Sequence, residues 1–143
     1  MLINSIQLAV LHRAKQKESL RKPFFLYIDE AHSFLSLSLA EIPSEARKYG
    51  LSLFITHQYI DQLHEKIRLA IFGNAGTIIS FRVGAEDAEI LSWEFYPVYL
   101  VDDFINLPRF SMYMKLMTDG VNPKPFSAKT NTLTPYLWSS NKL

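Results

Sequence analysis

The chain has 143 residues, of which 48% are hydrophobic, 13% aromatic and 20% charged. This composition excludes a disordered chain, and the length allows one domain with a single core. The 15 basic and 14 acidic side chains give a net charge of +1, so bulk charge predicts neither a nucleic-acid partner nor a membrane partner. No cysteine is present, which excludes disulfides and thiolate zinc sites.

The N-terminal residues 2–17 predict a core-facing helix, because apolar residues recur on one helical stripe. The stripe consists of Leu2, Ile3, Ile6, Val10 and Ala14, with Leu8 and Leu11 at its border. A basic cluster follows: His12, Arg13, Lys15, Lys17, Arg21 and Lys22. These side chains either complement the dipole at the helix end or form a DNA-facing patch. The N-terminal sequence is not typical of a signal peptide, and no apolar stretch approaches the ~20 residues of a membrane-spanning helix.

The central stretch of the sequence is PFFLYIDEAH, in which five apolar residues, Phe24 to Ile28, run into Asp29 and Glu30. The unbroken apolar run predicts a strand buried on both faces of a parallel sheet, and open α/β sheets bind ligands at the carboxyl ends of such strands. The two acids suit nucleotide hydrolysis as a Walker B pair. Asp29 would hold hydrated Mg²⁺ near the phosphates, and Glu30 would orient and deprotonate the attacking water. Alternatively, both acids only end the strand and cap the next helix.

A second buried strand is predicted at Leu51 to Ile55, and it runs into Thr56 and Gln58. A helix closed by Gly50 separates the two strands, as in one βαβ crossover, so Gln58 is expected at the same edge of the sheet as Glu30. Gln58 could there read the γ-phosphate or hold the attacking water. The alternative is that the polar residues after this strand only satisfy a turn.

The remaining predicted elements are four helices and two strands. The patterns predict helices over residues 40–49, 59–72, from 85 onward and 101–107, and strands over 77–81 and 111–117, the last as an outer strand. Residues 119–143 are rich in Pro, Ser, Thr and Asn and are predicted to be a loosely ordered tail.

None of the five glycines begins the phosphate-binding pattern G-x-x-x-x-G-K-[ST]. Without the backbone amides and the lysine of that loop, nothing in the chain would hold a triphosphate. The chain is therefore expected to be the second half of an α/β ATPase domain. Its P-loop would lie upstream of Met1, in a truncated reading frame or a split protein. By itself the chain is expected to show no ATPase activity.

A helix followed in order by PFFLYIDEAHSF, AEIPSEARKYGLSLFITHQYIDQL and IFGNAGTIISFRVGAEDAEIL resembles the HerA/FtsK superfamily of DNA-translocating ATPases. The likeness spans about Leu2 to Met117 and is greatest to the conjugative DNA-transfer branch, the TraG/TraD-like coupling proteins of type IV secretion. It implies that residues 1–118 are the C-terminal portion of a RecA-like P-loop NTPase core, a mostly parallel sheet flanked by helices, lacking the P-loop half. It also implies a hexameric ring that binds ATP and Mg²⁺ between subunits and pumps DNA through its pore.

Carried over by residue, the resemblance assigns the Walker B pair to Asp29 and Glu30 and the polar sensor to Gln58. Arg47 and Arg82 are candidates either for reaching the nucleotide of a neighbouring subunit or for surface salt bridges. The implied location is the cytoplasm, at the inner face of the membrane in a full-length protein. A type IV secretion or membrane partner would bind through segments outside this chain.

Two other interpretations stay open. The chain could be a non-catalytic remnant, an interaction module that binds a partner through the sheet edge left open by its missing half. The letters DEAH at residues 29–32 also invite comparison with superfamily-2 helicases. Thr56-His57-Gln58 is a poor match to the Ser-Ala-Thr-like motif of those helicases, and their arginine-rich Q-x-x-G-R-x-G-R segment is absent from the sequence.

Overall fold

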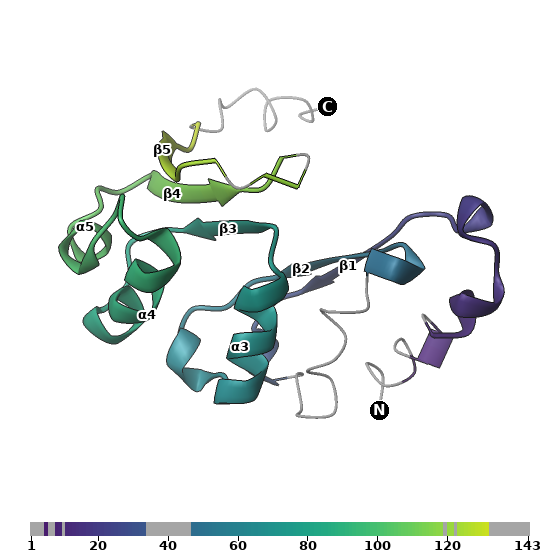
Figure 1. Cartoon of the computed structure of the whole chain (residues 1–143). Helices are drawn as coiled ribbons and strands as arrows, with labels where there is room; N and C mark the ends of the chain where they lie inside the picture. Colours follow the sequence, from purple (N-terminus) through teal and green to yellow (C-terminus); the bar gives the residue numbers. More distant parts are fainter. Residues whose placement is uncertain are drawn as a thin grey trace, which may run out of the picture. The chain divides into compact units, whose positions relative to one another are not determined.

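The computed structural model describes residues 5, 8–9, 11–33, 47–118, 120–121 and 123–131. The chain divides into two compact units, unit 1 (Met1–Ala75) and unit 2 (Gly76–Leu143). Unit 1 contains a two-stranded parallel sheet, and unit 2 contains a three-stranded antiparallel sheet (Figure 1). Both units combine helices with strands, so the fold is α/β, although parallel pairing is confined to unit 1 among the described residues.

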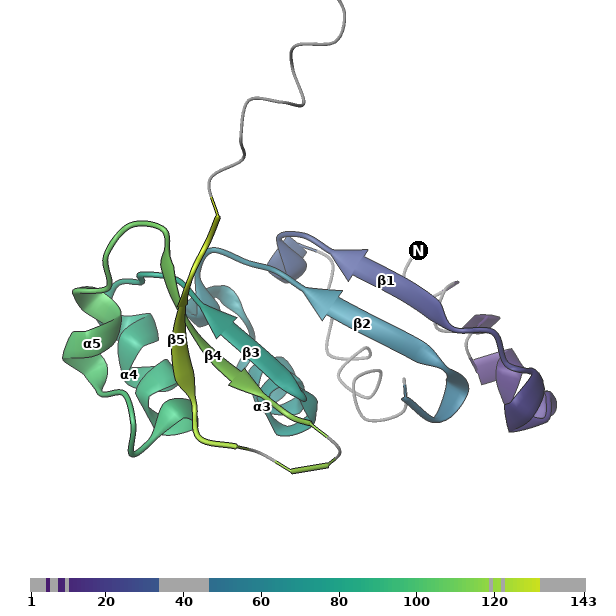
Figure 2. The ribbon, with the colours of Figure 1, turned by 90° about the horizontal axis from the view of Figure 1, so that it is seen from above.

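The sheet of unit 1 consists of β1 (Phe24–Ile28) and β2 (Leu51–Ile55), and both strands have the predicted bounds. They run side by side in the same direction, with Ile28 opposite Ile55 (Figure 2). Gly50 precedes β2 at φ +69°, a left-handed conformation that favours glycine. Gly50 thus has a conformation suited to the predicted helix C-cap, but most of the predicted helix lies outside the described residues, and β2 begins directly after Gly50.

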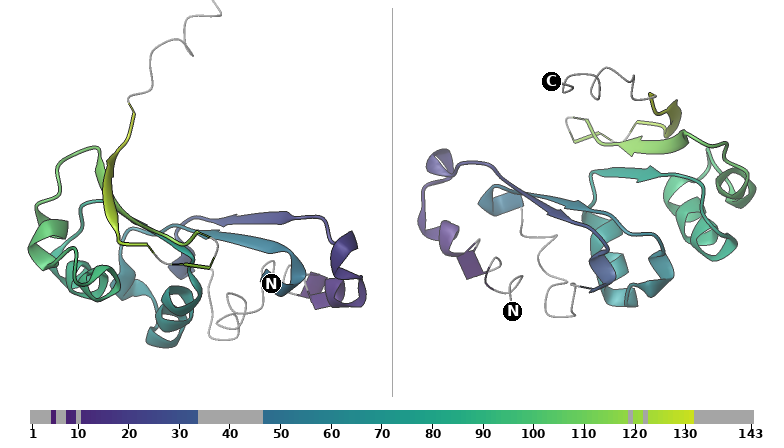
Figure 3. Two further views of the ribbon diagram at one scale, coloured as in Figure 1. Left: turned by 45° about the horizontal axis from the view of Figure 1, so that its top comes forward. Right: turned by 180° about the vertical axis from the view of Figure 1, so that it is seen from behind.

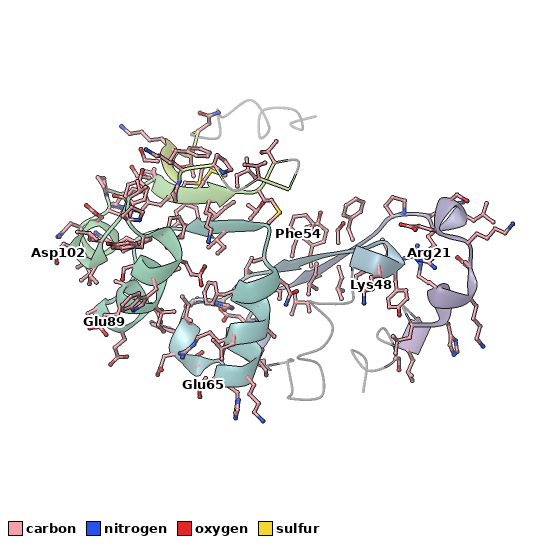
Figure 4. All side chains as sticks on the ribbon, in the orientation of Figure 1. Arg21, Lys48, Phe54, Glu65, Glu89 and Asp102 are labelled. Atoms are coloured by element: carbon pink, nitrogen blue, oxygen red, sulfur yellow. The ribbon has the colours of Figure 1, made fainter. Side chains whose placement is uncertain are left out.

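The predicted burial of β1 on both faces is wrong. Ile28 is buried on one face of the sheet, whereas Phe25 and Tyr27 on the other face are 55% and 70% exposed. Phe54 of β2 stacks on Tyr27 with the ring centroids 4.6 Å apart, and its side chain is also exposed (Figure 4). All three rings therefore have a large part of their surface exposed. A continuous apolar run shows that a strand can be buried on both faces. Whether it is buried depends on the other segments that pack against the sheet, and the run itself does not define them.

The N-terminal helix differs from the prediction. The described residues are helical up to His12, and a 3₁₀ turn at Arg13–Lys15 follows. Leu8 and Leu11, expected at the border of the buried stripe, are exposed. The stripe residues Leu2, Ile3, Ile6 and Val10 lie outside the described part of the chain.

Arg21 fixes the segment that follows this turn. Its guanidinium donates to the carbonyl oxygens of Arg13 at 3.1 Å, Gln16 at 2.9 Å and Lys48 at 2.5 Å, and it lies 5.8 Å from the centre of the Tyr49 ring. The side chains of Arg21 and Lys48 can be located in Figure 4. Because Arg21 binds backbone carbonyls, its role is structural, and it ties the basic cluster to the chain just before β2.

The predicted helix over residues 40–49 falls mostly outside the described residues, and Arg47–Tyr49 forms a 3₁₀ turn. The helix predicted over 59–72 is divided. A 3₁₀ turn at Ile60–Gln62 is followed by α3 (Glu65–Asn74), and His64 caps α3 by accepting a hydrogen bond from the Lys66 amide at 3.3 Å. The predicted buried stripe is confirmed at Ile60, Leu63 and Ile67.

The described part of unit 2 contains two helices and three strands: β3 (Thr77–Ser80), α4 (Ala85–Phe95), α5 (Val101–Ile105), β4 (Ser111–Leu116) and β5 (Phe126–Lys129). The strand order is β3-β4-β5, so β4 is central and its predicted outer position is wrong. The tail predicted to be loosely ordered also forms β5. The chain returns through a turn in which Thr118 and Val121 exchange backbone hydrogen bonds around Gly120, at φ +77°.

Aromatic rings fill the core of unit 2. Phe95 and Phe104 are 0% exposed and meet edge to face at 5.3 Å, and Phe104 meets Tyr113 in the same way. The helices α4 and α5 lie on one face of the β3-β4-β5 sheet (Figure 3). Unit 2 therefore buries a core between one helical layer and one sheet face.

Candidate functional site

Four polar residues gather where β1 and β2 end, and they are called here the polar edge: Asp29, Glu30, Thr56 and Gln58. The parallel ladder continues beyond the strands. The Thr56 amide donates to the Ile28 carbonyl at 2.9 Å, and the Ala31 amide donates to the Thr56 carbonyl at 3.2 Å. The backbone of the polar edge is thus fixed by the same kind of bonds as the sheet.

Two hydrogen bonds between side chains cross the polar edge. The Thr56 hydroxyl donates to Asp29 Oδ1 at 2.5 Å, and Gln58 Nε2 donates to Glu30 Oε1 at 2.6 Å. The structure therefore brings Glu30 and Gln58 together at one edge of the sheet, as the crossover spacing predicts. Each carboxylate that follows β1 has its own polar partner after β2.

Glu30 adopts an unusual backbone conformation, with φ +49°. For a residue with a side chain, such a conformation costs about 1 to 3 kcal/mol unless the surroundings enforce it. Here the Ser33 amide donates to the Glu30 carbonyl at 3.0 Å, and the next residue, Ala31, is completely buried. The strain is thus held by the turn after β1, and this turn places the Glu30 carboxylate beside Gln58.

Asp29 has the chemistry of a magnesium ligand. Its side chain is exposed, and Oδ1 accepts from both the Glu30 amide at 3.1 Å and Thr56. Its other oxygen, Oδ2, accepts no hydrogen bond from any residue that the structure describes. Mg²⁺ in nucleotide sites keeps several waters and takes one or two carboxylates together with phosphate oxygens, and Asp29 fits that donor set. Within the described part of the chain, no three His, Cys, Asp or Glu residues cluster to hold a metal ion unaided.

The two candidate arginines are placed differently. Arg82 follows β3 in unit 2 and its side chain is exposed. Arg47 begins the 3₁₀ turn before Gly50, and its side chain lies outside the described part of the structure. The possibility that either guanidinium reaches a nucleotide therefore stays a prediction.

Sequence reasoning did not assign a role to Thr56. The signal lies in the register of the strands: Ile28 is opposite Ile55, so the residues that follow, Asp29 and Thr56, are opposite each other. A hydroxyl residue at that position can reach a carboxylate on the neighbouring strand. Only the register, and not the apolar pattern of either strand, shows this pairing.

Solved structures show what this fold resembles. The plasmid coupling protein TrwB in complex with the non-hydrolysable ATP analogue ADPNP matches with a TM-score of 0.68 and 16% identity, over 89% of this chain and 35% of that chain. The genome packaging NTPase B204 from Sulfolobus turreted icosahedral virus 2, in complex with AMPPCP, matches with a TM-score of 0.57 and 17% identity, over 90% of this chain and 59% of that chain. The comparison with curated proteins gave no match.

The mixed α/β fold, with its parallel pair of strands, matches the fold of TrwB, so the predicted fold class is confirmed. The chain spans about a third of the length of the coupling protein that it matches. Residues 23–94, half of the sequence, match the family described as the TraM recognition site of TraD and TraG. The chain belongs to this family, and the predicted likeness to the conjugative DNA-transfer branch is confirmed. No helix among the described residues has both the length and the apolar character needed to cross a membrane.

Proposed function

We propose that this chain supplies the hydrolytic edge of an ATP-driven, DNA-translocating motor of the conjugative type. In this proposal Asp29 positions hydrated Mg²⁺, Glu30 is the general base, and Gln58 is the sensor. The observation that carries the proposal is the 2.6 Å hydrogen bond between Gln58 Nε2 and Glu30 Oε1, at the carboxyl ends of neighbouring parallel strands. Ligands of open α/β sheets bind at such ends.

The roles follow from the chemistry of the polar edge. Bound Mg²⁺ would neutralise charge on the phosphates. Glu30 would accept a proton from the attacking water, and its position is fixed by the turn after β1. Gln58 Nε2 carries two protons, so it can donate one to Glu30 Oε1 and the other to an oxygen of the γ-phosphate. Gln58 would in this way couple the state of the nucleotide to the state of the base.

The proposed motor needs more than this chain. We propose that it binds ATP and Mg²⁺, acts on DNA and assembles with further copies as a hexameric ring at the cytoplasmic face of the membrane, with the phosphate-binding loop supplied by an additional segment. We refer to the chain together with that segment as the assembled ATPase. Family membership supports these proposals, as do the solved relatives, whose complexes contain ATP analogues.

Turnover by the assembled ATPase tests the proposal. Glu30→Gln should lower kcat by about 10²- to 10⁴-fold and leave nucleotide binding largely intact, because only the base is lost. Glu65→Gln is the matched control: Glu65 is an exposed carboxylate in the first turn of α3, and its loss should leave turnover unchanged. Normal turnover in Glu30→Gln would remove the assignment. The chain alone should not hydrolyse ATP, and robust turnover by it would also contradict the account.

A second candidate is an interaction module without catalysis. The exposed rings of Phe25, Tyr27 and Phe54 favour it, because contiguous exposed aromatic groups mark contact surfaces. The family is described by recognition of TraM, a property named for TraD and TraG. If the module interpretation holds, Glu30→Gln leaves every measured function of the complete protein unchanged, whereas Phe54→Ala weakens partner binding.

A further inference from the structure

We propose that Thr56 is a positioning residue, which holds the Asp29 carboxylate so that Oδ2 is presented to a hydrated divalent cation. This inference rests on the proposed role of Asp29 as the magnesium ligand. Oδ1 accepts two hydrogen bonds, from the Thr56 hydroxyl at 2.5 Å and from the Glu30 amide at 3.1 Å. Because both donors engage the same oxygen, the carboxylate is fixed and the other oxygen remains available in the described structure.

The Thr56 hydroxyl is itself held in place. Thr56 donates its amide proton to Ile28 and accepts from Ala31 at its carbonyl, so it is bonded to the residues on both sides of the Asp29-Glu30 pair. Its β-branched side chain also restricts rotation about χ1. The hydroxyl is therefore presented to Asp29 by the backbone ladder, and it does not depend on the aromatic packing of the sheet.

A hydroxyl is required because the partner is an ionised carboxylate. An O–H donor stabilises a carboxylate by a charge-assisted hydrogen bond, whereas the isosteric methyl group of valine cannot donate. Removal of a hydrogen-bond donor that orients a metal ligand typically changes metal affinity by about 10- to 100-fold. Thr56→Val should therefore weaken cation binding at Asp29 by about that factor, and Thr56→Ser should retain it.

The test uses the chain itself, labelled with ¹⁵N and titrated with Mn²⁺ as a paramagnetic probe. Mn²⁺ should broaden the amide signals of Glu30 and Ala31 in the wild type, and the Mn²⁺ concentration that gives half of the broadening reports the affinity. Thr56→Val should raise this concentration about 10- to 100-fold, and Thr56→Ser should not. Thermal unfolding of each variant is measured in parallel, because a purely structural role would lower stability without changing the Mn²⁺ titration.

Asp29→Asn separates the inference from the proposed function. If Asp29→Asn leaves the broadening unchanged, the metal role of Asp29 fails, and the proposed mechanism fails with it. If Asp29→Asn abolishes the broadening while Thr56→Val titrates like the wild type, only the role of Thr56 is overturned. Should Thr56→Val fail to fold, Thr56→Ala lacks the hydroxyl without adding a methyl group, and wild-type Mn²⁺ affinity in that variant overturns the inference equally.

Discussion

The two units differ in how their aromatic side chains are buried. Unit 2 buries Phe95 and Phe104 completely between α4, α5 and one face of its antiparallel sheet. Unit 1 leaves Phe25 and Tyr27 exposed on its parallel sheet, and yet it carries the polar edge. In unit 1 the functional geometry comes from the backbone ladder between β1 and β2 and not from a closed aromatic core. Substitutions in the two units should therefore have different kinds of effect.

The largest effect is expected in the core of unit 2. Phe95→Ala removes a completely buried ring and should lower the free energy of unfolding by about 3 to 5 kcal/mol. Trp93→Ala, on the same helix but 81% exposed, is the matched control and should change it by less than about 0.5 kcal/mol. Urea unfolding followed by circular dichroism measures both. Equal losses in the two variants would mean that α4 does not bury the face shown here.

Unit 1 should be most sensitive at its backbone. Gly50 has φ +69°, and a Cβ at this position would meet only ordinary contacts at 3.8 Å, so Gly50→Ala should cost about 1 to 2 kcal/mol through conformation alone. Gly73→Ala is the control within α3, where a Cβ meets nothing within 4 Å and the loss of glycine flexibility should stabilise the unit by about 0.5 to 1 kcal/mol. The two variants are compared by thermal unfolding. Stabilisation by Gly50→Ala would contradict the left-handed turn before β2.

The pH dependence of stability should report the core of unit 2. Burial raises the pKa of the Tyr113 hydroxyl above its usual 10.0, and Asp103 and Tyr99 add to the rise. Above about pH 10 the unfolded chain loses this proton before the folded chain does, so stability should fall as the pH rises through that range. Absorbance of tyrosinate against pH should show the late titration of Tyr113, and Tyr113→Phe should remove that contribution. A titration unchanged by Tyr113→Phe would show that the ring is not buried as described.

The smallest effect is expected at the ion pair between Lys115 of β4 and Glu94 of α4, whose charged atoms are 3.2 Å apart. Both side chains are partly exposed, so solvent screens the pair, and Glu94→Gln should cost about 0.2 to 1 kcal/mol. The loss should shrink further at high salt, because salt screens exposed charges. A salt-independent loss of several kcal/mol would show that the pair is more deeply buried than in this structure.

The sequence predicted β1, β2 and the start of α4 well. Each begins or ends at a clear marker: Asp29 after β1, Gly50 before β2 and Gly84 before α4. The meeting of Glu30 and Gln58 was also predictable, since parallel strands joined by one crossover bring their carboxyl ends to one edge.

Other features depend on contacts distant in sequence. The exposure of Phe25 and Tyr27 depends on what covers the sheet, which an apolar run does not specify. The strand β5 was missed because FSAK is short and is stabilised by pairing with β4. The bond from Thr56 to Asp29 follows from the register between two strands, which neither strand defines alone.

The central claim is that Gln58 couples the bound nucleotide to the base Glu30, so that the two side chains act as a unit, and their double substitution tests it most directly. In the assembled ATPase, kcat is measured for Glu30→Gln, for Gln58→Ala and for the double variant. Because residues that act as a unit are not additive, the double variant should be about as slow as Glu30→Gln alone. A double variant slower by the product of the two separate losses would show that the two side chains act independently and would contradict the account.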